Sequence, residues 1–233
     1  MNRVWLPLLA PVMLYQGRRV RQRTPVLPEA GGARSGICGR GETRHLWVVG
    51  DSAAAGVGVA LQKEALTVRL AERLADTHTV HWQCHAKTGL TLNDTVALLD
   101  SMDAQRVDTL VVSAGVNDVV HMRSRRRWSK ALEQLAGLSR EKFGVSQLVV
   151  CAIPPMEAFP ALPWPLSAIM GARARRLNRL TRRRADALGF LFHDARIDVT
   201  GELMASDGFH PGPKGYQQWA SSLAQRLAGT AQT

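Results

Sequence analysis

Residues 46–52 read Leu-Trp-Val-Val-Gly-Asp-Ser, an apolar run that stops at a glycine, an acidic residue and a serine. A short, continuous apolar run bounded by turn residues is typical of a strand that is buried on both faces. The sequence therefore predicts a buried strand that ends at this serine. At such a turn, Ser52 would present its hydroxyl and its backbone N–H at the end of the sheet.

Strands and helices alternate along the rest of the chain. Further strands are predicted over residues 80–85, 108–113, 147–151 and 190–192, and helices over residues 59–75, 91–101, 128–143, 167–188 and 215–227. Thr91 and Asp94 have the spacing of a capping box at the start of the second helix. Alternation of this kind predicts an α/β fold of three layers, α/β/α, with a central parallel sheet of about five strands. Such sheets bind ligands beyond the carboxyl ends of their strands.

Composition narrows the class of protein. The 233 residues fit one domain, and the net charge of +11 favours anionic partners. An anionic membrane surface, an acidic acyl carrier protein and a phosphorylated substrate fit this charge, whereas nucleic acid is disfavoured because no binding motif is present. Arginines gather over residues 123–130 and 173–184. The cysteines at 38, 84 and 151 form no disulfide framework, which favours a reducing, cytoplasmic location.

Residues 1–44 differ from the rest and are predicted to be an extension of the domain. An apolar run over residues 5–15 is shorter than the ~20 residues that span a bilayer, and four arginines follow it by residue 23. Residues 24–44 are rich in proline and glycine and are predicted to be loop. Three interpretations stay open: a peripheral membrane anchor, which we favour, packing on the domain's own surface, and a cleaved secretory signal.

Residues with catalytic chemistry follow the predicted strands. Ser52 and Gly89 come after the first two strands, Asn117 after the third, and Asp207 and His210 stand just before the last helix. Each has an ordinary alternative role: a cap for Ser52, a turn for Gly89 and Asn117, and a surface pair for Asp207 and His210. Together, a serine, a histidine oriented by a carboxylate and N–H donors are what nucleophilic catalysis needs.

The blocks Gly-Asp-Ser, Gly, Gly-x-Asn-Asp and Asp-x-x-His, in this order, resemble those of the SGNH hydrolases, also called the GDSL family, over about residues 45–228. The resemblance implies a flavodoxin-like hydrolase domain over residues 45–233. It implies Ser52 as nucleophile, His210 as base and Asp207 as the residue that orients it. It also implies an oxyanion hole formed by the N–H groups of Ser52 and Gly89 and the side chain of Asn117, and no cofactor or metal.

Within the family, the sequence is most similar to those of bacterial esterases found with fatty-acid enol ester synthesis. The similar stretches include GDSAAAGVGV at 50–59, AKTGLTLNDT at 86–95 and ASDGFHPGPKGYQQWA at 205–220. The motif that gives the GDSL family its name has leucine where this sequence has Ala53. This position is next to the expected nucleophile and takes no part in the reaction.

A proline-rich apolar loop follows the fourth predicted strand, over residues 153–166. We expect it to overhang the site as the wall of an acyl pocket, with packing on the core as the alternative. The residues assigned to this pocket are Ile153, Pro154, Pro155, Met156, Phe159 and Trp164.

The predicted function is hydrolysis of acyl esters through an acyl-enzyme on Ser52. Lipid-like esters, lysophospholipids and acyl thioesters are the expected substrates because of the apolar loop and the basic surface. Three alternatives stay open: an acyltransferase that uses the same site, a catalytically silent module that binds anionic lipid or an acyl carrier, and a nucleic-acid binder, which is the least favoured. A metal site at His81, Cys84 and His85 is excluded, since strand alternation puts Cys84 on the opposite face from the histidines.

Overall fold

A computed structural model describes residues 5–194 and 201–229, with side chains from residue 11 onward. In this part of the chain, six strands form one sheet in the order β1-β3-β2-β4-β5-β6. The strands are β1 (Ser35–Gly39), β2 (Glu42–Gly50), β3 (His78–Ala86), β4 (Thr109–Ser113), β5 (Gln147–Cys151) and β6 (Leu191–His193). The strands β2 to β6 pair in parallel, which confirms the predicted parallel sheet.

The prediction of a loop over residues 24–44 is wrong in part, because β1 lies there and pairs antiparallel with β3. Its sequence, Ser-Gly-Ile-Cys-Gly, has little strand propensity. The strand lies at the edge of the sheet, where backbone hydrogen bonds to β3, rather than side-chain packing, stabilise it.

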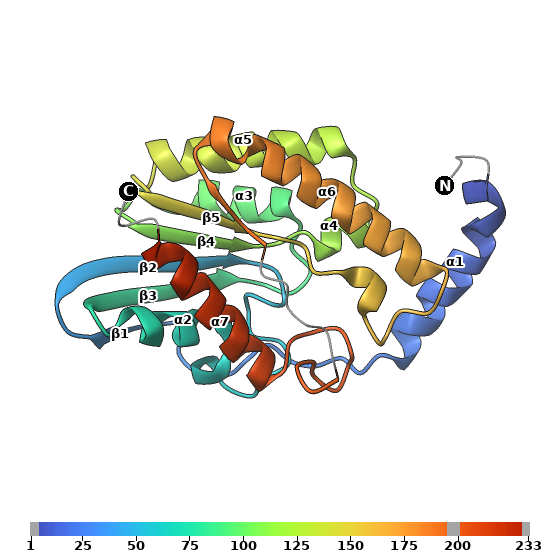
Figure 1. The fold of residues 1–233 in the computed structure, drawn as a ribbon, viewed down its shortest axis with the longest axis horizontal. Coiled ribbons are helices and arrows are strands. Elements are labelled where there is room, and N and C mark those ends of the chain that lie inside the picture. Colours follow the sequence, from blue (N-terminus) through green and yellow to red (C-terminus); the bar gives the residue numbers. More distant parts are fainter. Residues whose placement is uncertain (1–4, 195–200, 230–233) are drawn as a thin grey trace.

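Helices cover both faces of the sheet (Figure 1). One face carries α3 (Leu92–Ser101), α4 (Val116–Val120), α5 (Arg125–Glu141) and α6 (Leu166–Leu188), and the other carries α2 (Leu66–Leu74) and α7 (Pro213–Ala228). Successive residues of β2 alternate between the two cores: Leu46 and Val48 pack on the α2 and α7 side, Trp47 and Val49 on the other. All four are buried, so this strand is apolar on both faces as predicted.

The start of α3 follows the capping box expected from the sequence. The hydroxyl of Thr91 accepts from the N–H of Asp94 at 3.3 Å, and the Asp94 carboxylate accepts from the N–H of Thr91 at 3.0 Å. These bonds satisfy two backbone groups that a helix end would leave unpaired. They also fix where the chain turns after β3.

The helix predicted over residues 59–75 starts later than expected, at Leu66, after a single 3-10 turn over Gln62–Glu64. Consecutive turns occupy residues 52–58, and bends follow at residues 59 and 60. Gly58 has a φ of +105°, and a Cβ there would lie 2.2 Å from the carbonyl oxygen of Pro211. Ser52 thus lies in a run of turns and not at the start of a helix, and the close approach at Gly58 needs a glycine.

The helix α1 (Trp5–Arg23) lies outside the three layers, beyond the carboxyl ends of the strands (Figure 1). Gln16 donates to the carbonyl oxygen of Trp164 at 2.7 Å and accepts from the N–H of Leu166 at 3.2 Å. Met13 and Val20 pack against the core. Within the described residues, no helix combines the length and the apolar character needed to cross a membrane. A peripheral anchor at residues 1–44 stays a prediction.

Candidate active site

The turn that carries Ser52 is shaped by the contact between β2 and β4. Gly50, the last residue of β2, has a φ of +144°, and a Cβ there would lie 1.8 Å from the carbonyl oxygen of Ser113. The same carbonyl accepts from the N–H of Asp51 at 3.0 Å. Only glycine permits this close approach of the two strands, and the chain then turns so that Ser52 lies at the carboxyl edge of the sheet.

Three side chains from distant parts of the sequence form a hydrogen-bonded chain. The Oγ of Ser52 lies 2.8 Å from Nε2 of His210, and Nδ1 of His210 lies 2.6 Å from Oδ2 of Asp207. When Nδ1 donates to the carboxylate, Nε2 is left as an acceptor for the hydroxyl proton of Ser52. A hydroxyl with this base beside it can act as a nucleophile.

The carboxylate of Asp207 is buried, and burial raises its pKa. Hydrogen bonds from the ring and N–H of His210 and from the N–H of Phe209 outweigh burial, so the pKa of Asp207 lies below its usual value. Asp207 is therefore ionised at neutral pH, where it can stabilise a positive charge on the ring.

Gly89 lies in the loop after β3, and Asn117 lies in the first turn of α4, after β4. Gly89 has a φ of +90°. Asn117 donates through Nδ2 to the carbonyl oxygen of Leu90 at 2.9 Å, and Asp118 accepts from the N–H of Leu92 at 2.8 Å. These two bonds tie the start of α4 to the loop after β3. None of the hydrogen bonds described for Gly89 or Asn117 joins either residue to Ser52.

The carboxylates of Asp51 and Asp118 both accept from backbone N–H groups. Asp51 accepts from the N–H of Ala53 at 3.1 Å. Burial raises the pKa of Asp51 to about 7 and that of Asp118 to about 6. A protonated Asp51 adds no negative charge beside Ser52 at slightly acidic pH. Sequence patterns do not indicate this protonation because it arises from burial.

Residues 48–218 match the model of the GDSL-like lipase/acylhydrolase family. The match covers well over half of the polypeptide and includes Ser52, Asp207 and His210. The chain belongs to this family. It is accordingly a carboxylic ester hydrolase with a flavodoxin-like α/β/α fold.

Solved structures of other proteins share this fold. A carbohydrate acetylesterase from Sinorhizobium meliloti superposes with a TM-score of 0.59 at 18% identity, over 80% of this chain and 99% of that one. A GDSL-family lipolytic protein from Veillonella parvula gives 0.60 at 15% identity, over 78% and 97%. An acetylxylan esterase from Geobacillus stearothermophilus gives 0.55 at 15% identity, over 80% and 95%. No curated protein sequence matched the chain.

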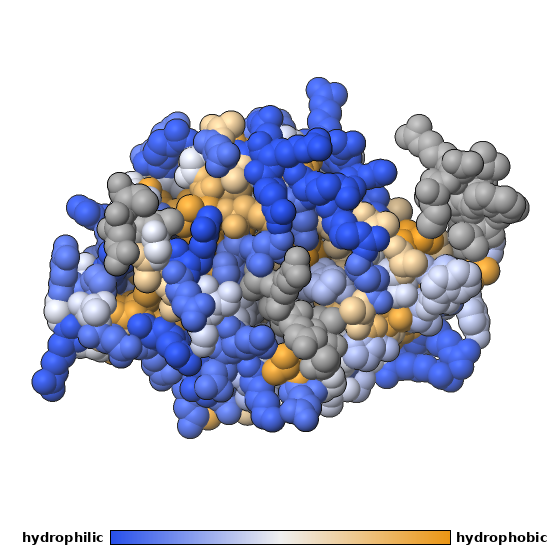
Figure 2. All heavy atoms as spheres, in the orientation of Figure 1, coloured by the Kyte–Doolittle hydropathy of each residue, from blue (hydrophilic) through white to orange (hydrophobic). Residues whose placement is uncertain are grey.

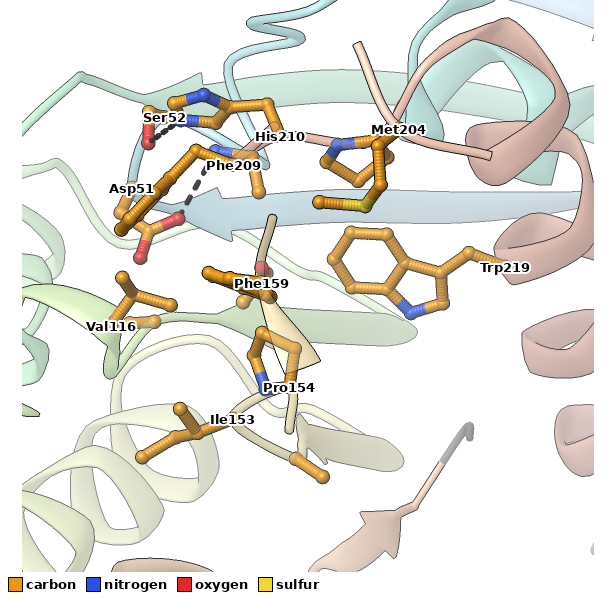
Figure 3. A pocket seen from close by; sticks show the side chains of 15 residues that line it. Asp51, Ser52, Val116, Ile153, Pro154, Phe159, Met204, Phe209, His210 and Trp219 are labelled. Atoms are coloured by element: carbon orange, nitrogen blue, oxygen red, sulfur yellow. Dashed lines mark hydrogen bonds between the residues drawn. The ribbon is translucent and has the colours of Figure 1, made fainter. Parts of the chain in front are cut away.

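A small apolar cavity of about 50 Å³ adjoins Ser52 and His210 in this GDSL-family hydrolase (Figure 3). Ile153, Pro154 and Phe159 of the predicted acyl-pocket loop line it. Met204 and Trp219 also line it, and these two were missed by the sequence analysis. Trp219 lies on α7, where helical spacing indicates only a core residue, so no local signal could have placed it at the site.

His210 also lines a larger groove of about 630 Å³. Met156 of the predicted loop lines this groove rather than the small cavity, together with Asp207 and Phe209. Pro155 and Trp164 line neither space, and the side chain of Trp164 is 78% exposed. The loop residues assigned to one acyl pocket are thus divided between two spaces and the surface.

Residues with metal-ligating side chains do not gather in the described part of this family member. No group of three or more His, Cys, Asp or Glu side chains has the arrangement of a metal site there. Cys84 is buried on the α2 and α7 side of the sheet, and its Sγ donates to the carbonyl oxygen of Ala54 at 3.3 Å. His85 packs instead against Trp47 on the other side.

Proposed function

We propose that this GDSL-family hydrolase is a serine esterase that cleaves lipid-like acyl esters through an acyl-enzyme on Ser52. The observation that carries the proposal is the 2.8 Å distance between Ser52 Oγ and His210 Nε2, with the carboxylate of Asp207 bound to the opposite ring nitrogen. This is the arrangement in which a histidine can take the proton of a serine hydroxyl as the oxygen attacks.

The reaction follows from this arrangement in two halves. In the first, Ser52 Oγ attacks the ester carbonyl carbon while Nε2 of His210 takes the hydroxyl proton. The resulting tetrahedral intermediate breaks the bond to the alcohol oxygen, which takes the proton from Nε2 and leaves. In the second half, water attacks the acyl-enzyme, gives its proton to Nε2, and the acid is released as Ser52 is protonated again.

The oxyanion of each tetrahedral intermediate needs hydrogen-bond donors. The family resemblance assigns this role to the N–H groups of Ser52 and Gly89 and to the side chain of Asn117. Asn117 carries two N–H bonds, and one of them holds the carbonyl oxygen of Leu90, which fixes the orientation of the amide. An amide held in place before the reaction loses little free energy to reorganisation as charge develops.

The surroundings of the serine support a lipid-like substrate. Both spaces beside His210 are lined mainly by apolar side chains, including Phe159, Met156 and Leu162. Lysophospholipids, acyl thioesters and other long-chain esters share an apolar acyl chain that such a lining can bury. The net charge of +11 favours approach to an anionic membrane surface or an acidic acyl carrier protein.

The test compares p-nitrophenyl esters of increasing chain length with wild type and with Ser52→Ala. We expect Ser52→Ala to lose hydrolysis to background for every ester and to lose labelling by a fluorophosphonate probe. Ser221→Ala is the matched control, because this α7 serine bonds only the helix backbone at Gln217. Equal hydrolysis by wild type and Ser52→Ala would remove the proposed mechanism.

A further inference from the structure

The larger groove beside His210 has one wall that comes from outside the family match. The match begins at residue 48, whereas one face of α1 lines the groove through Met13, Leu14, Gly17, Arg18, Val20 and Arg21. The spacing of three and four residues places these side chains together on one side of the helix. The other walls come from the catalytic domain, including His210 and Phe209. The groove therefore runs from the reactive histidine to α1.

The groove concentrates apolar surface that water would otherwise contact. In the described part of the chain, nine large hydrophobic side chains are exposed, and four of them, Leu14, Val26, Val120 and Met122, line this groove. Figure 2 shows hydrophobic residues beside α1 and hydrophilic ones at its lower end. An exposed apolar lining of this kind marks a surface that binds an apolar partner.

The volumes of the two spaces indicate which of them can bind a long acyl chain. The small cavity at Ser52, about 50 Å³, has room for only a few water-sized groups, so a long chain does not fit there. The groove of about 630 Å³ lies in the range of roughly 300–1,000 Å³ that is common for small-molecule sites. His210 lines both spaces, so they adjoin each other. One substrate molecule can therefore place its acyl chain in the groove and its ester carbonyl at Ser52.

Gly17 keeps the α1 wall open. It lies in the interior of α1, where glycine is a poor helix former, and it lines the groove. A Cβ built on Gly17 would meet no atom within 4 Å. A larger side chain at this position would therefore enter free space in the groove rather than clash with the protein. The absence of a side chain leaves that space to a ligand.

We propose that α1 forms the outer wall of an acyl-chain site, so that this N-terminal helix sets the enzyme's preference for long-chain acyl esters. The inference rests on the proposed serine esterase function. The acyl chain lies along Gly17 and the apolar side chains that face it, while the aliphatic stems of Arg18 and Arg21 extend the wall and their charged ends stay in water.

Gly17→Phe tests the site by filling it. We expect kcat/KM for p-nitrophenyl decanoate to fall at least about tenfold, since each methylene kept from burial weakens binding about fourfold. Hydrolysis of p-nitrophenyl acetate should stay within about twofold, because a two-carbon acyl group does not reach α1. Equal losses for both esters would overturn the proposal.

Two glycine variants serve as controls. Gly17→Ala adds only a methyl group and should lower the ratio of decanoate to acetate hydrolysis less than Gly17→Phe does. Gly137→Phe places the same ring on α5, at another helical glycine with no atom within 4 Å of the added Cβ and outside the groove. If Gly137→Phe lowers decanoate hydrolysis as Gly17→Phe does, the effect does not come from the groove and the proposal fails.

The chain that occupies the groove is identified with a pair of isomeric esters. Ethyl decanoate should lose hydrolysis in Gly17→Phe, while decyl acetate should not. The opposite result would place the alcohol in the groove and overturn the assignment. A binding measurement separates this inference from the proposed function: decanoate binding to Ser52→Ala, followed by calorimetry, should weaken about tenfold when Gly17→Phe is added. An unchanged Kd would overturn the proposed acyl-chain site. The serine mechanism is judged separately, because it is overturned only if Ser52→Ala keeps its activity.

Discussion

The carboxylate of Asp207 binds both the ring and the backbone of His210, through Oδ2 to Nδ1 at 2.6 Å and through Oδ1 to the N–H at 3.0 Å. The two contacts define the position of the residue and the rotation of its ring. They also leave Nε2 directed at Ser52, so the orientation of the ring depends on one buried carboxylate.

Replacement of Asp207 should therefore affect the rate more than the fold. Asp207→Asn keeps the shape of the side chain but can donate to Nδ1, which favours the ring tautomer that carries its proton on Nε2. We expect kcat to fall by about 10³–10⁴-fold. Asp194→Asn is the control, since Asp194 pairs with Arg182 at the surface. Steady-state kinetics on one ester checks both, and an Asp207→Asn enzyme within about threefold of wild type would contradict the assigned role.

Asn117 should contribute mainly to the transition state. Asn117→Ala is expected to lower kcat by about 10²–10³-fold with a small change in KM, because the oxyanion exists only after attack. It should also cost roughly 1 kcal/mol of stability, since the carbonyl of Leu90 loses a donor. Asn93→Ala, at an exposed position of α3, is the comparison. A variant that unfolds more readily but keeps its kcat would leave Asn117 with a structural role alone.

Asp51 should make stability depend on pH. Its folded pKa is raised from 3.8 to about 7 by burial, so the folded protein keeps a proton that the unfolded chain has lost. The free energy of unfolding therefore falls as pH rises from about 4 to about 7, by an amount of the order of 4 kcal/mol for this group. Asp51→Asn should remove this part of the slope, as measured by urea unfolding at several pH values. Parallel curves for the two proteins would count against the raised pKa, because Asp118 titrates in both.

The contribution of the α3 capping box to the free energy of unfolding should be measurable by itself. Thr91→Ala removes the hydroxyl that accepts from the N–H of Asp94 and should lower the free energy of unfolding by about 1 kcal/mol. Thr91→Ser keeps the hydroxyl and should recover most of this loss. Urea unfolding of the three proteins gives the comparison, and equal stability of the alanine and serine variants would show that the lost methyl group, not the cap, is responsible.

Elements buried on one or both faces were predictable because burial on one face leaves a period in the sequence and burial on both faces leaves a continuous apolar run. The strand that ends at Gly50, the alternating strand through Cys84 and the amphipathic helix α5 were all expected near their observed positions. The strand β1 was missed because its pairing depends on backbone hydrogen bonds to β3, and a run with two glycines carries no such period. The late start of α2 was missed because Ala60 and Gln62 form backbone hydrogen bonds with Gly31, a contact that is not a local property.

The sequence by itself determined the order of strands and helices, the strand end that carries Ser52 and the pairing of Asp207 with His210, because these depend on burial periodicity and on residues only a few positions apart. Only the tertiary structure decided that Ser52 meets His210 across 158 positions, that the loop over residues 153–166 divides between two spaces, and that α1 closes the larger one. These relationships depend on where loops from different strands converge, and no local pattern of side chains carries that information.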